Sequence, residues 1–166
     1  MNDMTDETAI ETGERHMTVR RTFDASRERV WDAWTDSDQI DQWWGPDGFT
    51  TTTDEMDATP GGVWEFEMIG PDGEEYPNRI VYDEVERPER LAYTHGSPDD
   101  PEMFRVTVTF DERAGNTTEL TMESRYPSAE DLDDALEFGA DEGAAQTLGR
   151  LDEHLRRLDT TGGGEH

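Results

Sequence analysis

The sequence predicts a single α+β domain in which a curved antiparallel sheet closes on one long C-terminal helix. From about residue 49 to residue 124, apolar and polar residues alternate in short runs separated by glycine- and proline-containing turns. This pattern is typical of antiparallel strands with one buried face. From about residue 128 to residue 158, leucine and alanine recur at helical spacing, so this segment is expected to cover the buried face of the sheet.

One strand and two short helices are expected before this series. Residues 17–24 alternate in polarity and predict the first strand. Ser26 is a suitable N-cap for a helix over residues 29–35, whose apolar side chains recur at helical spacing. A second short helix over about 37–44 is stopped by the Gly-Pro-Asp-Gly turn at 45–48.

The strands that follow should bring the total to about six or seven. Runs with strict alternation predict strands over residues 49–56, 63–69, 79–85, 91–95, 104–110 and 118–124. The inner face should then carry Trp64, Phe66, Phe104, Val106, Leu120 and Met122, and the outer face Glu65, Glu67, Arg105, Thr107, Glu119 and Thr121.

The C-terminal helix is expected to begin after Ser128, which forms a capping-box pattern with Asp131. It should run to about Leu158 and contain Gly139 and Gly143, where small residues either bring the helix close to the sheet or leave space above it. This order of elements, with one long helix held by a curved sheet, is the helix-grip arrangement.

The amino-acid composition indicates the environment in which the protein works. The 166 residues include 42 acidic and 14 basic side chains, all the latter arginine, for a formal net charge of −28, and the mean hydropathy is −0.98. At about 1 M salt the Debye length falls to roughly 3 Å, so dense surface carboxylates cease to repel one another. The composition therefore predicts a halophilic protein of a salt-rich, haloarchaeal cytoplasm. Intrinsic disorder is the alternative, but the aromatic content and strand alternation disfavour it.

The same composition excludes several classes. The chain has no cysteine, so disulfide and thiolate chemistry are absent. Residues 1–14 lack the basic and apolar regions of a signal peptide, and no apolar run is long enough to span a membrane. The negative charge disfavours nucleic acid and anionic lipid as partners. We expect an acidic disordered tail at residues 1–15 and a disordered tail at 159–166, flanking one domain at 16–158.

Several ordered segments resemble the START-like (SRPBCC) superfamily and, within it, homologues of the activator of heat shock protein 90 ATPase. The resemblance covers roughly residues 17–158 and rests on residues 23–35, Gln42-Trp43-Trp44-Gly45-Pro46, Gly61-Gly62-Val63-Trp64-Glu65-Phe66, residues 87–94 and the C-terminal helix. It implies an apolar cavity between sheet and helix and an association with stress response. Where the family usually has a bulky aromatic residue after the glycine at position 143, this chain has Ala144.

The candidate ligand-binding residues are mostly inward-facing aromatics, since ligand pockets are largely apolar with few polar groups. They are Trp43, Trp44, Trp64, Phe66, Met68, Tyr82, Tyr93, His95, Phe104, Phe138 and Gly143. We expect them to surround a cavity of roughly 300–1,000 Å³ near the two helix glycines. Ordinary core packing is the alternative for each one.

The favoured function is therefore a binding or carrier protein for a small apolar or amphipathic molecule, acting as a monomer or homodimer. No nucleophile–base set, histidine pair at metal spacing or cofactor motif is found, so no catalytic residue, metal or cofactor is assigned. Two alternatives stay open. One is a chaperone-accessory or protein-interaction domain. The other is a cyclase-like or hydrolytic enzyme using His95, Tyr93 or a cavity carboxylate such as Glu142.

Overall fold

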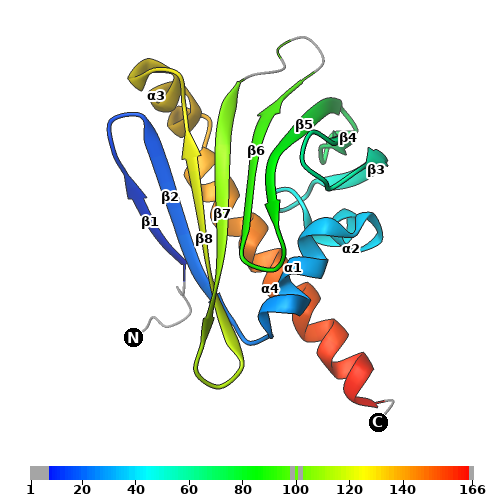
Figure 1. Ribbon diagram of the computed structural model, residues 1–166. Coiled ribbons are helices and arrows are strands. Elements are labelled where there is room, and N and C mark those ends of the chain that lie inside the picture. Colours follow the sequence, from blue (N-terminus) through cyan, green and yellow to red (C-terminus); the bar gives the residue numbers. More distant parts are fainter. Residues whose placement is uncertain (1–7, 98–99, 101–102, 165–166) are drawn as a thin grey trace.

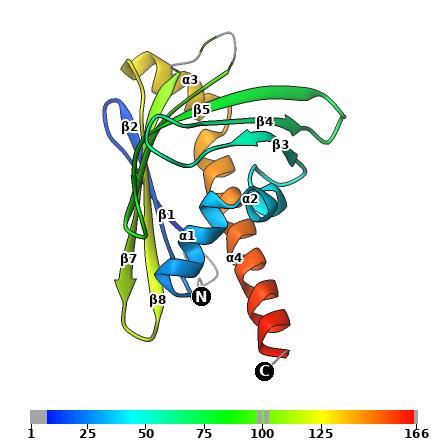
Figure 2. The same ribbon diagram turned by 45° about the vertical axis from the view of Figure 1, so that its right-hand side comes forward.

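One antiparallel sheet curves around the long C-terminal helix, and two short helices lie on the same side of it (Figures 1 and 2). The computed structural model describes residues 8–97, 100 and 103–164, with side chains described as far as residue 158. Within these residues the sheet has eight strands in the order β1-β2-β8-β7-β6-β5-β4-β3. The elements are β1 Thr8–Thr12, β2 His16–Phe23, α1 Arg27–Thr35, α2 Ser37–Trp43, β3 Thr50–Met56, β4 Val63–Ile69, β5 Glu75–Glu86, β6 Arg90–Gly96, β7 Phe104–Arg113, β8 Thr117–Arg125, α3 Ala129–Glu137 and α4 Ala140–Gly164.

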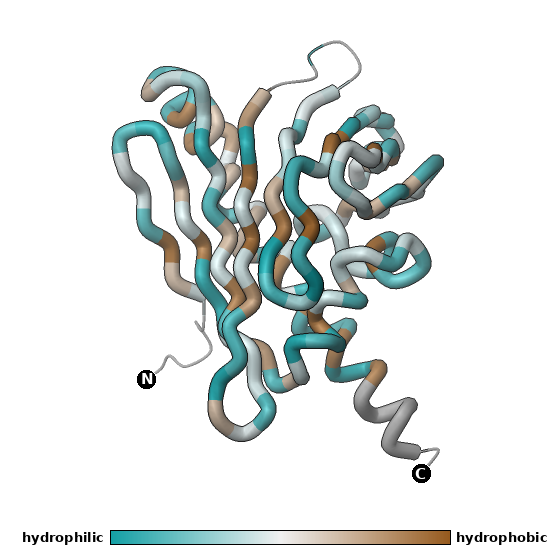
Figure 3. Tube along the Cα trace, in the orientation of Figure 1, coloured by the Kyte–Doolittle hydropathy of each residue, from teal (hydrophilic) through white to brown (hydrophobic). Residues whose placement is uncertain are grey.

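Alternation along the strands builds the core, as the sequence predicted. Hydrophobic and hydrophilic residues alternate visibly along the central strands in Figure 3. On β4, Trp64 and Phe66 are buried, whereas Glu65 points outward and pairs with Arg79 at 3.6 Å. Because successive side chains point to opposite faces, the inner face meets the helices and the outer face meets solvent. The helix-grip fold is confirmed.

The first helix packs against the inner face near the β7–β8 hairpin. Ser26 caps it, with the Ser26 hydroxyl oxygen accepting a hydrogen bond from the Arg29 amide at 3.3 Å. Trp31 and Trp34 are buried, and their rings lie 5.3 and 6.2 Å from that of Phe110. These contacts place both tryptophans in the core.

The N-terminal segment differs from the prediction. Residues 8–12, expected to belong to a disordered tail, form the edge strand β1, which pairs with β2 from Thr8 opposite Arg21 to Thr12 opposite Met17. This strand has Ile10 as its one large apolar residue, 39% exposed. Its stability therefore comes from backbone pairing with β2. Such pairing requires no alternation of apolar and polar residues, so the sequence carries no sign of this strand. The rest of the N-terminal tail lies outside the described residues.

The C-terminal helix also differs, because it is two helices. α3 is capped by Ser128, as predicted, but ends at Glu137. Gly139 then adopts a φ of +85°, a left-handed conformation that suits glycine and terminates helices. α4 starts directly afterwards, and the Gly139 carbonyl accepts from the Gly143 amide at 2.8 Å. α4 continues to Gly164, so the tail predicted from residue 159 is helical over its described part. None of the described helices is long and apolar enough to cross a membrane.

Candidate functional site

Most of the predicted lining residues pack against one another in the core. Trp43, Trp44, Trp64 and Phe66 form a continuous series of ring contacts. Ring centroids are 5.7 Å apart for Trp43 and Trp44, 5.1 Å for Trp44 and Trp64, and 4.0 Å for Trp64 and Phe66. All four are buried. The space expected to be a cavity at this end of the sheet is therefore filled by aromatic rings.

Two of these tryptophans also have their polar atoms satisfied. The Trp43 indole nitrogen donates to the Ala33 carbonyl at 3.1 Å. The Trp64 indole nitrogen donates to the Thr53 hydroxyl at 3.0 Å, and that hydroxyl donates to Asp41 at 2.6 Å. Buried polar groups need such partners. These bonds fix the rings as parts of the structure, and a ligand-binding role for them stays a prediction.

Three predicted polar candidates lie deeper along the sheet. Tyr82 and Tyr93 face each other across β5 and β6 with ring centroids 6.3 Å apart. Burial raises the pKa of both phenols, with lesser contributions from Asp57 at Tyr82 and from Tyr82 at Tyr93. The buried Tyr93 hydroxyl has no hydrogen-bond partner among the described residues. Both phenols therefore stay neutral and are poorly suited to general-base chemistry.

His95 is held by one hydrogen bond and by ring contacts with Phe66 and Phe104. Its Nε2 lies 3.0 Å from the Asn78 side-chain oxygen, and its ring centroid lies 4.9 Å from that of Phe104. Burial lowers the pKa of His95 to about 4. At neutral pH the ring is therefore uncharged, and it supports Phe104 from within the fold.

A pocket of about 500 Å³ opens beside Phe104, at the end of the sheet where α3 meets α4. We call it the helix-side pocket. Its lining residues are Asp100, Met103, Phe104, Tyr126, Pro127, Asp131, Asp134, Ala135, Phe138 and Ala140. The rings of Phe104 and Tyr126 stack with centroids 5.1 Å apart and 26° between their planes. This stacked pair gives the pocket a rigid aromatic wall.

Charge at the mouth of the helix-side pocket is entirely negative. Asp100, Asp131 and Asp134 line it and are exposed, and no basic residue is among the lining side chains. An anionic ligand group would be repelled by the three carboxylates. The pocket suits a neutral or cationic molecule with an apolar body.

Only some of the remaining predicted ligand-binding residues lie at the helix-side pocket. Phe104 and Phe138 line the helix-side pocket, but the Phe138 side chain is 92% exposed because it lies at the break between the two helices. Phe138 therefore borders the pocket from its exposed side, and its predicted ligand-binding role stays a prediction. Met68 packs half-buried against the core, and Gly143 faces Pro46 outside the pocket. The helix-side pocket thus lies near Gly139 and away from Gly143, whereas the sequence predicted a cavity near both glycines.

Sequence reasoning missed several lining residues, chiefly Tyr126. Its signal was present, because Leu120, Met122, Ser124 and Tyr126 occupy alternate positions and continue the inner face of β8 by one more residue. Ala135 gave no such signal, since its position depends on the break between α3 and α4, and Met103 lies just before β7, outside the alternation of that strand. Among the described residues, no group of histidine, aspartate and glutamate is arranged to hold a metal ion.

The fold and the helix-side pocket together define a START-like helix-grip domain. The family model described as activator of Hsp90 ATPase homolog 1-like protein matches residues 24–156, and the chain belongs to this family. A search of curated proteins found no match.

Solved structures agree with this assignment. Protein Ms6760 from Mycobacterium smegmatis is 29% identical, with a TM-score of 0.83 over 91% of this chain and 98% of that one. A protein from Arthrobacter aurescens is 25% identical, with a TM-score of 0.83 over 90% and 91%. Protein NE0264 from Nitrosomonas europaea, 20% identical with a TM-score of 0.81 over 90% and 99%, shares the fold.

Proposed function

We propose that the protein binds a small apolar or amphipathic molecule, neutral or cationic, in the helix-side pocket. The observation that carries the proposal is the pocket itself. It has about 500 Å³ beside a stacked pair of aromatic rings. This volume lies within the range of roughly 300–1,000 Å³ that small-molecule sites occupy. Its apolar lining and its few polar groups at the mouth also fit that class of site.

Exposed apolar side chains at the mouth support the same proposal. Phe138 is 92% exposed and Met103 is 44% exposed, and both line the pocket. Large apolar side chains left in water at a concave site are typical of a binding surface. A bound molecule would cover part of both side chains and gain roughly 25 cal/mol for each Å² of apolar surface removed from water.

A neutral fluorescent probe tests the proposal. Nile red should bind the wild-type protein with saturable fluorescence enhancement. In Ala135→Trp, a bulky ring on α3 would occupy the pocket, so we expect Nile red binding at least tenfold weaker. The matched control is Ala129→Trp, since Ala129 lies on the same helix but is exposed and outside the pocket. The control should bind as the wild type does.

Equal binding by both tryptophan variants would contradict the proposal, provided that melting curves show both to be folded. A crystal structure with the probe among the buried tryptophans would also contradict the location. Failure of the wild type to bind any apolar probe would instead favour the second candidate, a chaperone-accessory domain that uses exposed Phe138 and Met103 to contact a protein. Their exposure is the observation that favours this candidate.

An enzymatic role has less support. Neither His95 nor Tyr93 lines the helix-side pocket, and a ring nitrogen of His95 is engaged by Asn78. We place the binding function in a salt-rich cytoplasm on the basis of the net charge of −28.

A further inference from the structure

A second pocket lies on the outer face of the sheet, opposite the helices. We call it the outer-face pocket. It has about 540 Å³ and is lined by Arg15, Asp83, Thr94, Phe104, Arg105, Arg125, Tyr126 and Pro127. It therefore borders the helix-side pocket at Phe104, Tyr126 and Pro127. The proposed apolar ligand makes no use of its charged residues.

The charge of the outer-face pocket reverses that of the chain. The whole sequence has 42 acidic and 14 basic residues, which is three acids for each base. The pocket lining has three arginines and one carboxylate, so its formal charge is +3 − 1 = +2. Selection for an acidic surface alone would not place several arginines together in one pocket. The reversal points to a local function.

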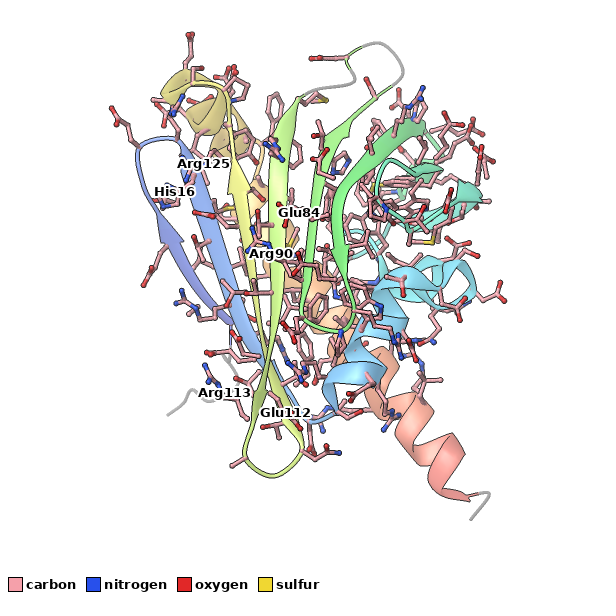
Figure 4. The ribbon with its side chains drawn as sticks, viewed as in Figure 1. His16, Glu84, Arg90, Glu112, Arg113 and Arg125 are labelled. Atoms are coloured by element: carbon pink, nitrogen blue, oxygen red, sulfur yellow. The ribbon has the colours of Figure 1, made fainter. Side chains whose placement is uncertain are left out.

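Strand register places two of these arginines side by side. Arg105 on β7 lies directly opposite Arg125 on β8, with Thr94 and His16 on the neighbouring strands in the same row. Side chains paired in this way have Cβ atoms about 4.5–5.5 Å apart, and like charges so placed destabilise a sheet. Figure 4 shows Arg125 and His16 toward the same end of the outer face, away from Arg113 at the other end. An anion bound between two such guanidinium groups would remove the repulsion.

The two guanidinium groups keep capacity for such an anion. Arg105 pairs with Asp83 at 3.2 Å and Arg125 with Glu123 at 3.7 Å, and their side chains are 64% and 54% exposed. Arg15 donates to the Pro127 carbonyl at 3.3 Å, which holds its side chain at the edge of the pocket. Each guanidinium has five N–H donors in a planar fork. One carboxylate partner leaves donors for a second oxyanion.

We propose that the outer-face pocket binds a small dianion, a phosphate monoester or a dicarboxylate, between Arg105 and Arg125 with Arg15 at its edge. Arginine forks match the oxygens of phosphate and carboxylate groups in a bidentate manner. The site is separate from the helix-side pocket, so it does not depend on the function proposed above.

Calorimetric titration of inorganic phosphate at pH 7.5 and constant ionic strength tests the site. The wild type should bind one phosphate saturably. Arg105→Gln and Arg125→Gln should each weaken binding at least tenfold. The matched control is Arg113→Gln, because Arg113 lies on the same strand as Arg105 and is also exposed and paired, with Glu119. It should bind within twofold of wild type. Succinate is titrated in parallel, and whichever anion binds more tightly identifies the ligand as a phosphate ester or a carboxylate.

Loss of fold is separated from loss of binding by melting curves for each variant. In the wild type, the side-chain N–H resonances of Arg105 and Arg125 should shift on addition of phosphate, whereas those of Arg113 should not. Heats that never saturate, or equal weakening in Arg113→Gln, would overturn the proposal and leave the arginines as members of a charge-paired surface.

Discussion

The two pockets are similar in size and share a wall, yet their charges are opposite. The helix-side pocket of about 500 Å³ carries three aspartates and no basic residue, whereas the outer-face pocket of about 540 Å³ carries three arginines and one aspartate. The wall between them is the stacked pair Phe104 and Tyr126. Neighbouring surfaces of one small domain are thus suited to ligands of opposite charge.

The difference in charge arises because adjacent residues on β7 and at the end of β8 point to opposite faces of the sheet. Phe104 precedes Arg105 on β7, and Tyr126 follows Arg125 at the end of β8. Since successive strand residues point to opposite faces, each pair supplies an aromatic ring to the helix side and a guanidinium to the outer face. The aromatic pair and the arginine pair are therefore positioned by the same register between β7 and β8.

The largest expected effect comes from removing the shared wall. Phe104→Ala deletes the ring stacked on Tyr126 and in contact with His95. Because the side chain is half-buried, we expect a loss of about 2–4 kcal/mol in the free energy of unfolding, with Nile red binding weakened at least tenfold. Chemical denaturation measures the first effect and fluorescence titration the second.

Phe138→Ala is the control for this variant. Phe138 also lines the helix-side pocket but is 92% exposed. Its removal should therefore change the free energy of unfolding by less than about 0.5 kcal/mol, while still weakening the binding of Nile red. Equal stability of the Phe104 variant and wild type would show that the wall is dispensable.

Acid should disturb the helix-side pocket through His95. Its pKa is about 4 in the folded protein against 6.5 for the free side chain, so the folded state favours the neutral ring. Its contribution to stability is therefore full above pH 6.5 and is lost as pH falls from 6.5 toward 4. At 1.36 kcal/mol per pKa unit, this loss is at most about 3 kcal/mol.

Denaturation of wild type and His95→Gln between pH 7 and pH 4 isolates this contribution from that of the carboxylates. The variant should be less stable than wild type at pH 7, and the gap should narrow in acid. A gap that stays constant over this range would show that protonation of His95 is not linked to folding.

Salt should affect ligand binding differently in the two pockets. The Debye length is about 30 Å at 0.01 M salt and 3 Å at 1 M. Raising NaCl between these values should increase the melting temperature, because it screens the net charge of −28. It should also weaken phosphate binding, and it should change Nile red affinity by less than about twofold, because apolar burial is little affected by screening. A melting temperature insensitive to salt would remove the basis for the proposed salt-rich cytoplasm.

The smallest effect is expected deep in the core, away from both pockets. The buried Tyr93 hydroxyl has no partner among the described residues. Leaving a buried polar group unsatisfied costs about 1–3 kcal/mol, so Tyr93→Phe should leave stability unchanged or raise it by about 1 kcal/mol. Nile red affinity should not change. A marked loss of probe binding would instead assign Tyr93 to a ligand site.

The fold was predictable because each strand carries its own alternation. Trp64 and Phe66 against Glu65 identify the buried face of β4 without knowledge of any other strand. Two features lacked a local signal. The edge strand β1 depends on pairing with β2. The break at Gly139 depends on its left-handed backbone, and glycine is also tolerated inside helices at a cost of about 1 kcal/mol.

The sequence predicted the apolar character of the candidate site better than its location in the fold. Inward aromatic residues indicated an apolar region, but sequence alone does not show which of them fill space and which border it. The tryptophans contact one another, whereas Phe104 contacts Tyr126 at an open edge. The sequence predicted Arg105 on the outer face but gave no sign of its neighbour Arg125, because the two residues are far apart in sequence and meet through register.

The stacked rings of Phe104 and Tyr126 should separate two independent sites. Titrating phosphate into protein saturated with Nile red tests this most directly. We predict a phosphate dissociation constant within about twofold of that of the probe-free protein, and no release of Nile red at saturating phosphate. Displacement of Nile red by phosphate, with mutual weakening of tenfold or more, would show that both ligands compete for one site and would contradict the account.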